Sequence, residues 1–90
     1  MGITIKIHPI LSQYAGDRDK VEVNGSTVGD CLNDLVEQFP DIKKELFNKN
    51  GGLLHYISIW VNGADTYPAE LAKQVRDGDE LYLLPLFAGG

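Results

Sequence analysis

The sequence predicts an α+β roll, in which a mixed sheet of four to five strands packs on one main helix. Segments near both ends of the chain alternate apolar and polar residues, as half-buried strands do. One segment between them repeats its apolar residues with the period of a helix. With 43% hydrophobic residues, the chain has enough material for one small domain, residues 1–90, around one core.

The first two strands are expected near the N-terminus. In the segment ITIKIH, three isoleucines at alternate positions share one face. Pro9 ends this strand, and the segment PILSQYAGDR is expected to be a loop. The segment DKVEV alternates again, with Val21 and Val23 inward, and is expected to pair with the first strand as a hairpin.

The main helix is expected in the segment STVGDCLNDLVEQF. Its apolar residues recur three and four positions apart: Val28, Cys31, Leu32, Leu35, Val36 and Phe39. Thr27 followed by Asp30 resembles a capping box, although Asp is shorter than the usual Glu. Pro40 ends or resets the helix, and the spacing of Ile42 and Leu46 predicts a second short helical turn.

The second half of the chain predicts two more strands. YISIWV reads as a strand that closes on Asn62-Gly63, a strong hairpin signal. AELAKQVRDGDE holds a weak helical turn and then a tight turn at Asp77-Gly78. LYLLPL is continuously apolar, which predicts a central strand covered on both faces. Because proline cannot donate to a ladder, Pro85 is expected where the pairing stops.

Composition excludes several functional classes. The net charge is −5, and no basic cluster occurs beyond Lys43-Lys44, which argues against a nucleic-acid partner. No segment has the pattern of a signal peptide or approaches the roughly 20 apolar residues of a membrane span. A single cysteine fits a reducing compartment, so we expect a cytoplasmic protein with no membrane partner.

The residues that often carry chemistry have plainer interpretations here. Cys31 lies on the apolar stripe of the helix, where a cysteine is usually a small buried hydrophobe and only rarely a nucleophile. His8 and His55 lack the spacing of metal ligands, so no metal site is expected. Trp60 is either an exposed partner contact or a packing partner of Tyr82, and the sequence leaves both open.

The C-terminal segment is the exception. The last strand runs into residues 87–90, FAGG, which we expect to form a flexible tail. Glycine has no Cβ, so such a tail can thread a narrow channel in a partner; the threading residues are Ala88, Gly89 and Gly90. The carboxylate of Gly90 is then the reactive group, and another enzyme must activate it. The residues expected to dock on a partner are Leu84, Leu86 and Phe87.

The order of elements and three short motifs resemble a known family. The motifs are VNG at 61–63, DGDELYLLP at 77–85 and AGG at 88–90. The chain resembles the ubiquitin-like β-grasp sulfur carriers of the MoaD/ThiS type, and within them the MoaD- and CysO-type branch. A departure is Phe87, which is bulkier than the small residue often found there.

The resemblance implies a mechanism and partners. An E1-like adenylyltransferase, using ATP and magnesium, would adenylate Gly90, and a sulfur donor would displace AMP to leave a thiocarboxylate. A second enzyme would take the sulfur: the large subunit of molybdopterin synthase, a cysteine synthase-like enzyme, or a thiazole synthase. Chain length and the LFAGG ending favour the first two. The carrier would have no catalytic residues of its own and bind no cofactor.

Two alternatives stay open. The activated Gly90 could instead be attacked by a lysine amine, which would make the chain a ubiquitin-like protein modifier. A plain binding module with an irrelevant tail is the third hypothesis, because a fold alone does not fix a function.

Overall fold

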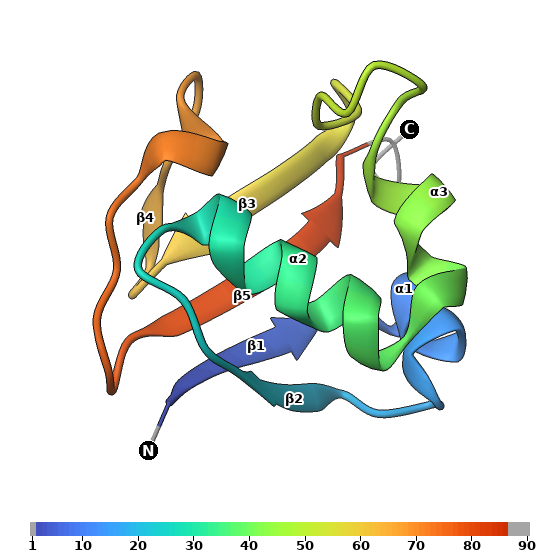
Figure 1. Ribbon diagram of the computed structural model, residues 1–90, viewed down its shortest axis with the longest axis horizontal. Coiled ribbons are helices and arrows are strands. Elements are labelled where there is room, and N and C mark those ends of the chain that lie inside the picture. The colour runs from blue at the N-terminus through green and yellow to red at the C-terminus, as the bar shows by residue number, and fades with distance from the viewer. Residues whose placement is uncertain (1, 87–90) are drawn as a thin grey trace.

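The fold is a five-stranded mixed sheet wrapped on one main helix (Figure 1). The computed structural model describes residues 2–86. The strands lie in the order β2-β1-β5-β3-β4. Their bounds are β1 (Ile3–Ile7), β2 (Lys20–Val23), β3 (Ile57–Val61), β4 (Ala64–Asp65) and β5 (Glu80–Pro85). β1 and β5 pair in parallel and the other neighbours pair antiparallel, so the predicted α+β roll is confirmed.

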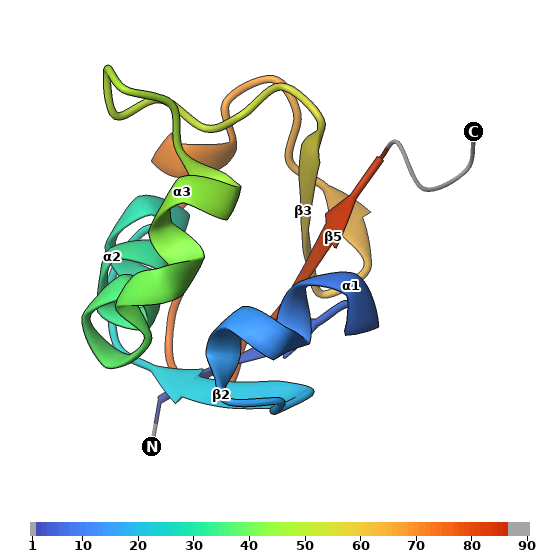
Figure 2. The same ribbon diagram turned by 90° about the vertical axis from the view of Figure 1, so that its right-hand side faces the viewer.

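The helices gather on one side of the sheet. Figure 2 shows α2 and α3 on the same side of β3 and β5. Their bounds are α1 (Pro9–Ser12), η1 (Gln13–Ala15), α2 (Val28–Gln38), η2 (Pro40–Ile42), α3 (Lys43–Leu46) and η3 (Glu70–Ala72). None of the helices found in residues 2–86 has the length and apolarity needed to cross a membrane.

The core lies between the sheet and the helical side. The inward residues of the three central strands are buried: Ile3, Ile5, Ile7, Ile57, Ile59, Val61, Leu81 and Leu83. From α2, the predicted stripe supplies Val28, Cys31, Leu32 and Leu35, while Val36 and Phe39 are partly buried at its margin. Ile42 and Leu46 are fully buried, which confirms the second helical turn.

The start of α2 is capped as predicted, with one difference. Thr27 Oγ1 accepts a hydrogen bond from the Asp30 backbone N–H at 3.1 Å. The return bond does not reach the Thr27 backbone, as a capping box would require. Asp30 Oδ2 instead accepts from the backbone N–H of Ser26 at 3.3 Å and from its hydroxyl at 3.1 Å. Asp30 therefore ties the segment before the helix to its first turn.

The expected loop after Pro9 was wrong, because α1 and η1 occupy it. Pro9 stands at the first helical position, where its missing N–H is no loss. The side chain of His8 caps the helix: Nδ1 accepts from the Ile10 backbone N–H at 3.1 Å. Leu11 and Ala15 are buried, so tertiary burial stabilises a segment whose local sequence favours a loop.

The central position of β5 is confirmed, but its expected cover on both faces was wrong. Leu81 and Leu83 are fully buried, whereas Tyr82, on the other face, is 39% exposed. One face of this apolar strand therefore packs in the core, and the other apolar face is exposed to solvent. We call this exposed side of the sheet the open face. Pro85 is the last residue of β5, as predicted, and one further backbone bond joins Leu86 N–H to Tyr56 C=O at 2.6 Å.

Candidate docking site

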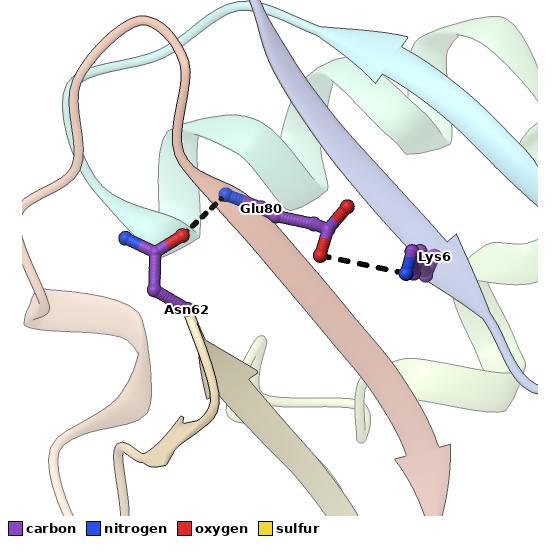
Figure 3. Close-up of polar contacts among 3 residues, drawn as sticks. All are labelled: Lys6, Asn62 and Glu80. Atoms are coloured by element: carbon purple, nitrogen blue, oxygen red, sulfur yellow. Dashed lines mark hydrogen bonds and ion pairs between the residues drawn. The ribbon is translucent and has the colours of Figure 1, made fainter.

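The site begins at the turn between β3 and β4, where two of the family-like motifs meet. Asn62 and Gly63 have φ values of 50° and 86°, the left-handed backbone that a two-residue hairpin of this kind requires. Asn62 Oδ1 accepts from the Glu80 N–H at 2.9 Å (Figure 3). The Asn62 backbone N–H donates to the Glu80 carbonyl at 2.8 Å. The VNG motif therefore fixes the start of β5.

Asp79 completes this junction. Asn62 Nδ2 donates to Asp79 Oδ1 at 3.0 Å, and the Arg76 backbone N–H donates to Oδ2 at 3.0 Å. These hydrogen bonds lower the pKa of the Asp79 carboxyl, with help from the charges of Arg76 and Lys73. The DGDE segment is thus a braced turn, as predicted, and the strand that leads to the tail begins from a fixed point.

The open face of the sheet carries a row of large side chains. In register across four strands stand Lys6, Tyr82, Trp60 and Asp65. Trp60 is half-buried, and its Nε1–H donates to Ser58 Oγ at 2.9 Å, which fixes the orientation of the indole. A hollow of about 430 Å³ opens here, lined by Lys6, Trp60, Gly63, Glu80, Leu81 and Tyr82. We call it the aromatic hollow.

Of the two interpretations of Trp60, the structure confirms the pairing with Tyr82, and the contact with a partner stays a prediction. Trp60 stands directly opposite Tyr82 on the neighbouring strand, and it also borders a hollow that a partner can enter. Trp and Tyr are the residues most enriched where binding energy concentrates. The aromatic hollow is therefore a sound place for a docking partner to anchor.

An ion pair lies at the edge of the aromatic hollow. Lys6 Nζ lies 3.5 Å from Glu80 Oε1, and both side chains are about half exposed, at 45% and 50% (Figure 3). An exposed pair of this kind adds little to stability. Its two charges instead give a docking partner a polar rim around an aromatic centre.

Two of the predicted docking residues, Leu84 and Leu86, fall at the end of the same face. Leu84 stands opposite Ser58 and is half-buried, and Leu86, two positions further along, is 59% exposed. Phe87, Ala88, Gly89 and Gly90 lie outside the described residues. Lys6 and Glu80 were not predicted as site residues, although the alternation of the first strand already placed Lys6 on the outward face.

The cysteine and the two histidines make structural contacts. Cys31 is fully buried, and burial, together with the charges of Asp30 and Asp34, raises the pKa of its thiol to about 11. The interpretation of Cys31 as a buried hydrophobe is therefore confirmed. His8 caps α1, and the ring of His55 meets Tyr56 edge-on with centroids 5.5 Å apart. Within residues 2–86, no three His, Cys, Asp or Glu side chains are grouped to hold a metal ion.

Sequence comparison relates the whole chain to known carriers. The ThiS family model matches residues 5–90. A sulfur carrier protein CysO from Mycobacterium tuberculosis is 33% identical over 93 residues, which cover 100% of both chains. The small archaeal modifier protein 1 of Haloferax volcanii is 37% identical over 87 residues, 94% of this chain and 97% of that protein.

Structural comparison agrees. The CysO protein in a BexX/CysO complex from Amycolatopsis orientalis has a TM-score of 0.88 and 33% sequence identity, over 99% of this chain and 100% of that one. That protein is therefore known bound to a partner. The β-grasp fold implied by the three motifs is confirmed, and with a family model that spans residues 5–90 the chain belongs to the ThiS family.

Proposed function

We propose that this chain is a sulfur carrier that holds sulfur as a thiocarboxylate on Gly90. The observation that carries the proposal is the similarity, along the full length of both chains, to a sulfur carrier protein. The described fold supports it by what it provides: a rigid sheet whose central strand leads from the braced Asn62–Asp79 junction towards the tail.

The chemistry proceeds through activation by a partner. The Gly90 carboxylate attacks the α-phosphate of ATP, pyrophosphate leaves, and a mixed anhydride with AMP forms; magnesium balances the phosphate charge. A hydrosulfide ion delivered by the sulfur donor then attacks the carbonyl carbon, and AMP leaves to give the thiocarboxylate. The carrier itself supplies no catalytic residue, so an E1-like adenylyltransferase has to provide the catalysis.

The open face supports docking to such a partner. Fixing the backbone of a chain end in a partner's channel costs about 1–2 kcal/mol per residue, which contacts of the folded part must offset. The aromatic hollow, with Leu84 and Leu86 beyond it, provides an apolar surface for those contacts. We propose that the E1-like enzyme and the sulfur-accepting enzyme both use this face, in turn.

We propose that the carrier gives its sulfur to a cysteine precursor bound by a cysteine synthase-like enzyme. A CysO protein is among the relatives that align with this chain over the full length of both proteins. The molybdopterin converting factor subunit from Pyrococcus furiosus is only 22% identical, so it shows the shared fold alone. A molybdopterin precursor, used by the large subunit of molybdopterin synthase, is the second choice.

Protein modification is the second candidate function. It is favoured by 37% identity to a small archaeal modifier protein. The first step is the same, but a lysine amine rather than sulfur displaces AMP, and an isopeptide bond forms. Both functions fit one chain, because they diverge only after activation.

The test is reconstitution with a candidate E1-like enzyme, ATP, magnesium and a sulfur donor. Intact mass spectrometry should show one oxygen replaced by sulfur. Conjugates of higher mass that disappear when Gly90 is deleted would instead assign the modifier function. If cells that need the protein grow normally after removal of Gly89 and Gly90, the plain binding module is the correct reading.

A further inference from the structure

A second hollow lies on the helical side of the molecule. It measures about 430 Å³ and is lined by Pro40, Lys43, Lys44, Phe47, Asn48 and Lys49. We call it the lysine hollow. Two of its lysines belong to α3, which lies on the same side of the sheet as α2 (Figure 2). It is therefore on the side opposite to the open face and its aromatic hollow.

The lysine hollow is a positively charged patch on a chain whose net charge is negative. Its three lysines, against Glu45, give residues 43–49 a charge of +2, whereas the whole chain carries −5. All three lysines are exposed. Among residues 2–86 the ion pair found is Lys6–Glu80, so no described carboxylate lies within 4.0 Å of these three ammonium groups. Their charge is available to a partner.

The frame of the lysine hollow is rigid. Leu46 of α3 is fully buried in the core, and the Leu54 N–H donates to the Leu46 carbonyl at 2.7 Å. Asn48 Oδ1 accepts from the backbone N–H groups of Asn50 at 2.8 Å and Gly52 at 3.1 Å, which holds the following turn. A preformed surface loses less entropy on binding than a flexible loop does.

The hollow also has an apolar component. Phe47, which is half-buried, and Pro40 line the hollow together with the lysines. Apolar lining residues can contact an apolar side chain of a ligand, and the neighbouring ammonium groups can pair with its carboxylates.

Stabilisation of the helix dipole does not explain this cluster. Lys43 and Lys44 are the first two residues of the four-residue helix α3, the end at which the helix dipole disfavours positive charge. Lys49 lies beyond the helix, so the dipole does not account for it. The lining of one hollow by all three lysines therefore needs another explanation.

We propose that the lysine hollow binds an acidic segment of a partner protein, in which carboxylates flank one apolar side chain. Charge complementarity supports this occupant. Nucleic acids and anionic membranes are extended polyanions, and a net charge of −5 repels them. A short segment meets mainly the local positive charge, because charges beyond about 8 Å are screened at physiological ionic strength. The site is independent of sulfur transfer, and its position leaves the open face free for a second partner.

The test uses the whole chain and a synthetic peptide of sequence DEFDE, with NQFNQ and DEGDE as controls. Backbone amide spectra should show shifts confined to residues around 40–49 for the first peptide, and weaker binding for both controls. The triple variant Lys43→Gln/Lys44→Gln/Lys49→Gln should weaken binding about tenfold, as expected for the loss of three exposed ion pairs. The charge-matched variant Arg18→Gln/Lys20→Gln/Lys73→Gln should bind nearly as the parent does.

The same amide spectra verify that each variant is folded. Absence of shifts around residues 40–49, or equal loss of binding in both triple variants, would overturn the proposal, since net charge alone would then explain the result. Tighter binding of an oligothymidine or of phosphatidylserine vesicles at these residues would also overturn it, in favour of a nucleic acid or a membrane.

Discussion

At the scale of single residues, Asn62 has the most consequential set of contacts. Its backbone adopts the left-handed conformation, and its side chain binds both Asp79 and Glu80. One amide thus makes the hairpin turn and positions the central strand. The sequence identified the turn, because Asn-Gly is a strong hairpin signal, but the partners of the side chain lie 17 and 18 residues away and depended on the fold.

Asn62→Asp tests this role with little change in shape. The new carboxylate can still accept from the Glu80 N–H, but it loses the donor to Asp79 and places negative charge beside negative charge. We expect the melting temperature at neutral pH to fall by a few degrees. The deficit should shrink in acid as the carboxyls are protonated. Asn50→Asp, at another Asn-Gly pair, should have little effect, and equal losses would show that the junction is unimportant.

Two aspartates should dominate the acid dependence of stability. Hydrogen bonds, from Ser26 to Asp30 and from Asn62 to Asp79, lower the pKa of each carboxyl below its ordinary value of 3.8. Their contribution is therefore full above pH 3.8 and is lost as the pH falls through the lowered values. The double variant Asp30→Asn/Asp79→Asn should be less stable than the parent at neutral pH. Its free energy of unfolding should also fall less as the pH is lowered. Chemical denaturation over a pH series measures the free energy of unfolding, with Asp19→Asn as the control. If the double variant loses stability in acid as steeply as the parent, the two aspartates are not its main cause.

At the scale of elements, α2 is the part that the sequence predicted best. Its stripe, cap residue and end were all visible, because each depends on spacing within a few residues. The helical segment after Pro9 was missed, because its stability depends on burial of Leu11 and Ala15 in a core built from distant strands. Local sequence patterns therefore predicted the elements that depend on neighbouring residues and missed the one that depends on distant residues.

The cap of α2 gives a prediction at this scale. Thr27→Ala removes the acceptor for the Asp30 N–H and should cost about 1 kcal/mol of unfolding free energy. Thr27→Ser keeps the hydroxyl and should lose much less. Denaturant titration distinguishes them, and equal losses would mean that Thr27 acts through packing of its methyl group.

The open face gives a second prediction. Tyr82→Ala should weaken binding to the activating enzyme by roughly tenfold or more, as truncation of an aromatic anchor does. Because Tyr82 points away from the core but pairs with Trp60 on β3, the melting temperature should fall by only a few degrees. Calorimetry with a catalytically inactive E1-like enzyme measures the affinity, with Glu37→Ala on α2 as the matched exposed control. Parent-like affinity of Tyr82→Ala would exclude the aromatic hollow as the docking site.

At the scale of the whole molecule, fold and chemistry occupy different parts of the chain. Residues up to Pro85 form the sheet and its helical cover, and the proposed reactive group lies five residues later at Gly90. The central position of β5 was predictable from its apolarity. Its open face was not, because an apolar run looks the same whether one or both faces are covered by the chain itself.

The most direct test of the account is to locate the sulfur after reconstitution with an E1-like enzyme, ATP and a sulfur donor. Fragmentation mass spectrometry should place sulfur in the C-terminal fragment, with one oxygen of Gly90 replaced and Cys31 unmodified. Gly90→Ala should fold as the parent does and lose most of this labelling, because the added Cβ restricts the tail. Sulfur added to Cys31, or an unlabelled Gly90 in the presence of an enzyme that activates a known ThiS-family carrier, would contradict the account.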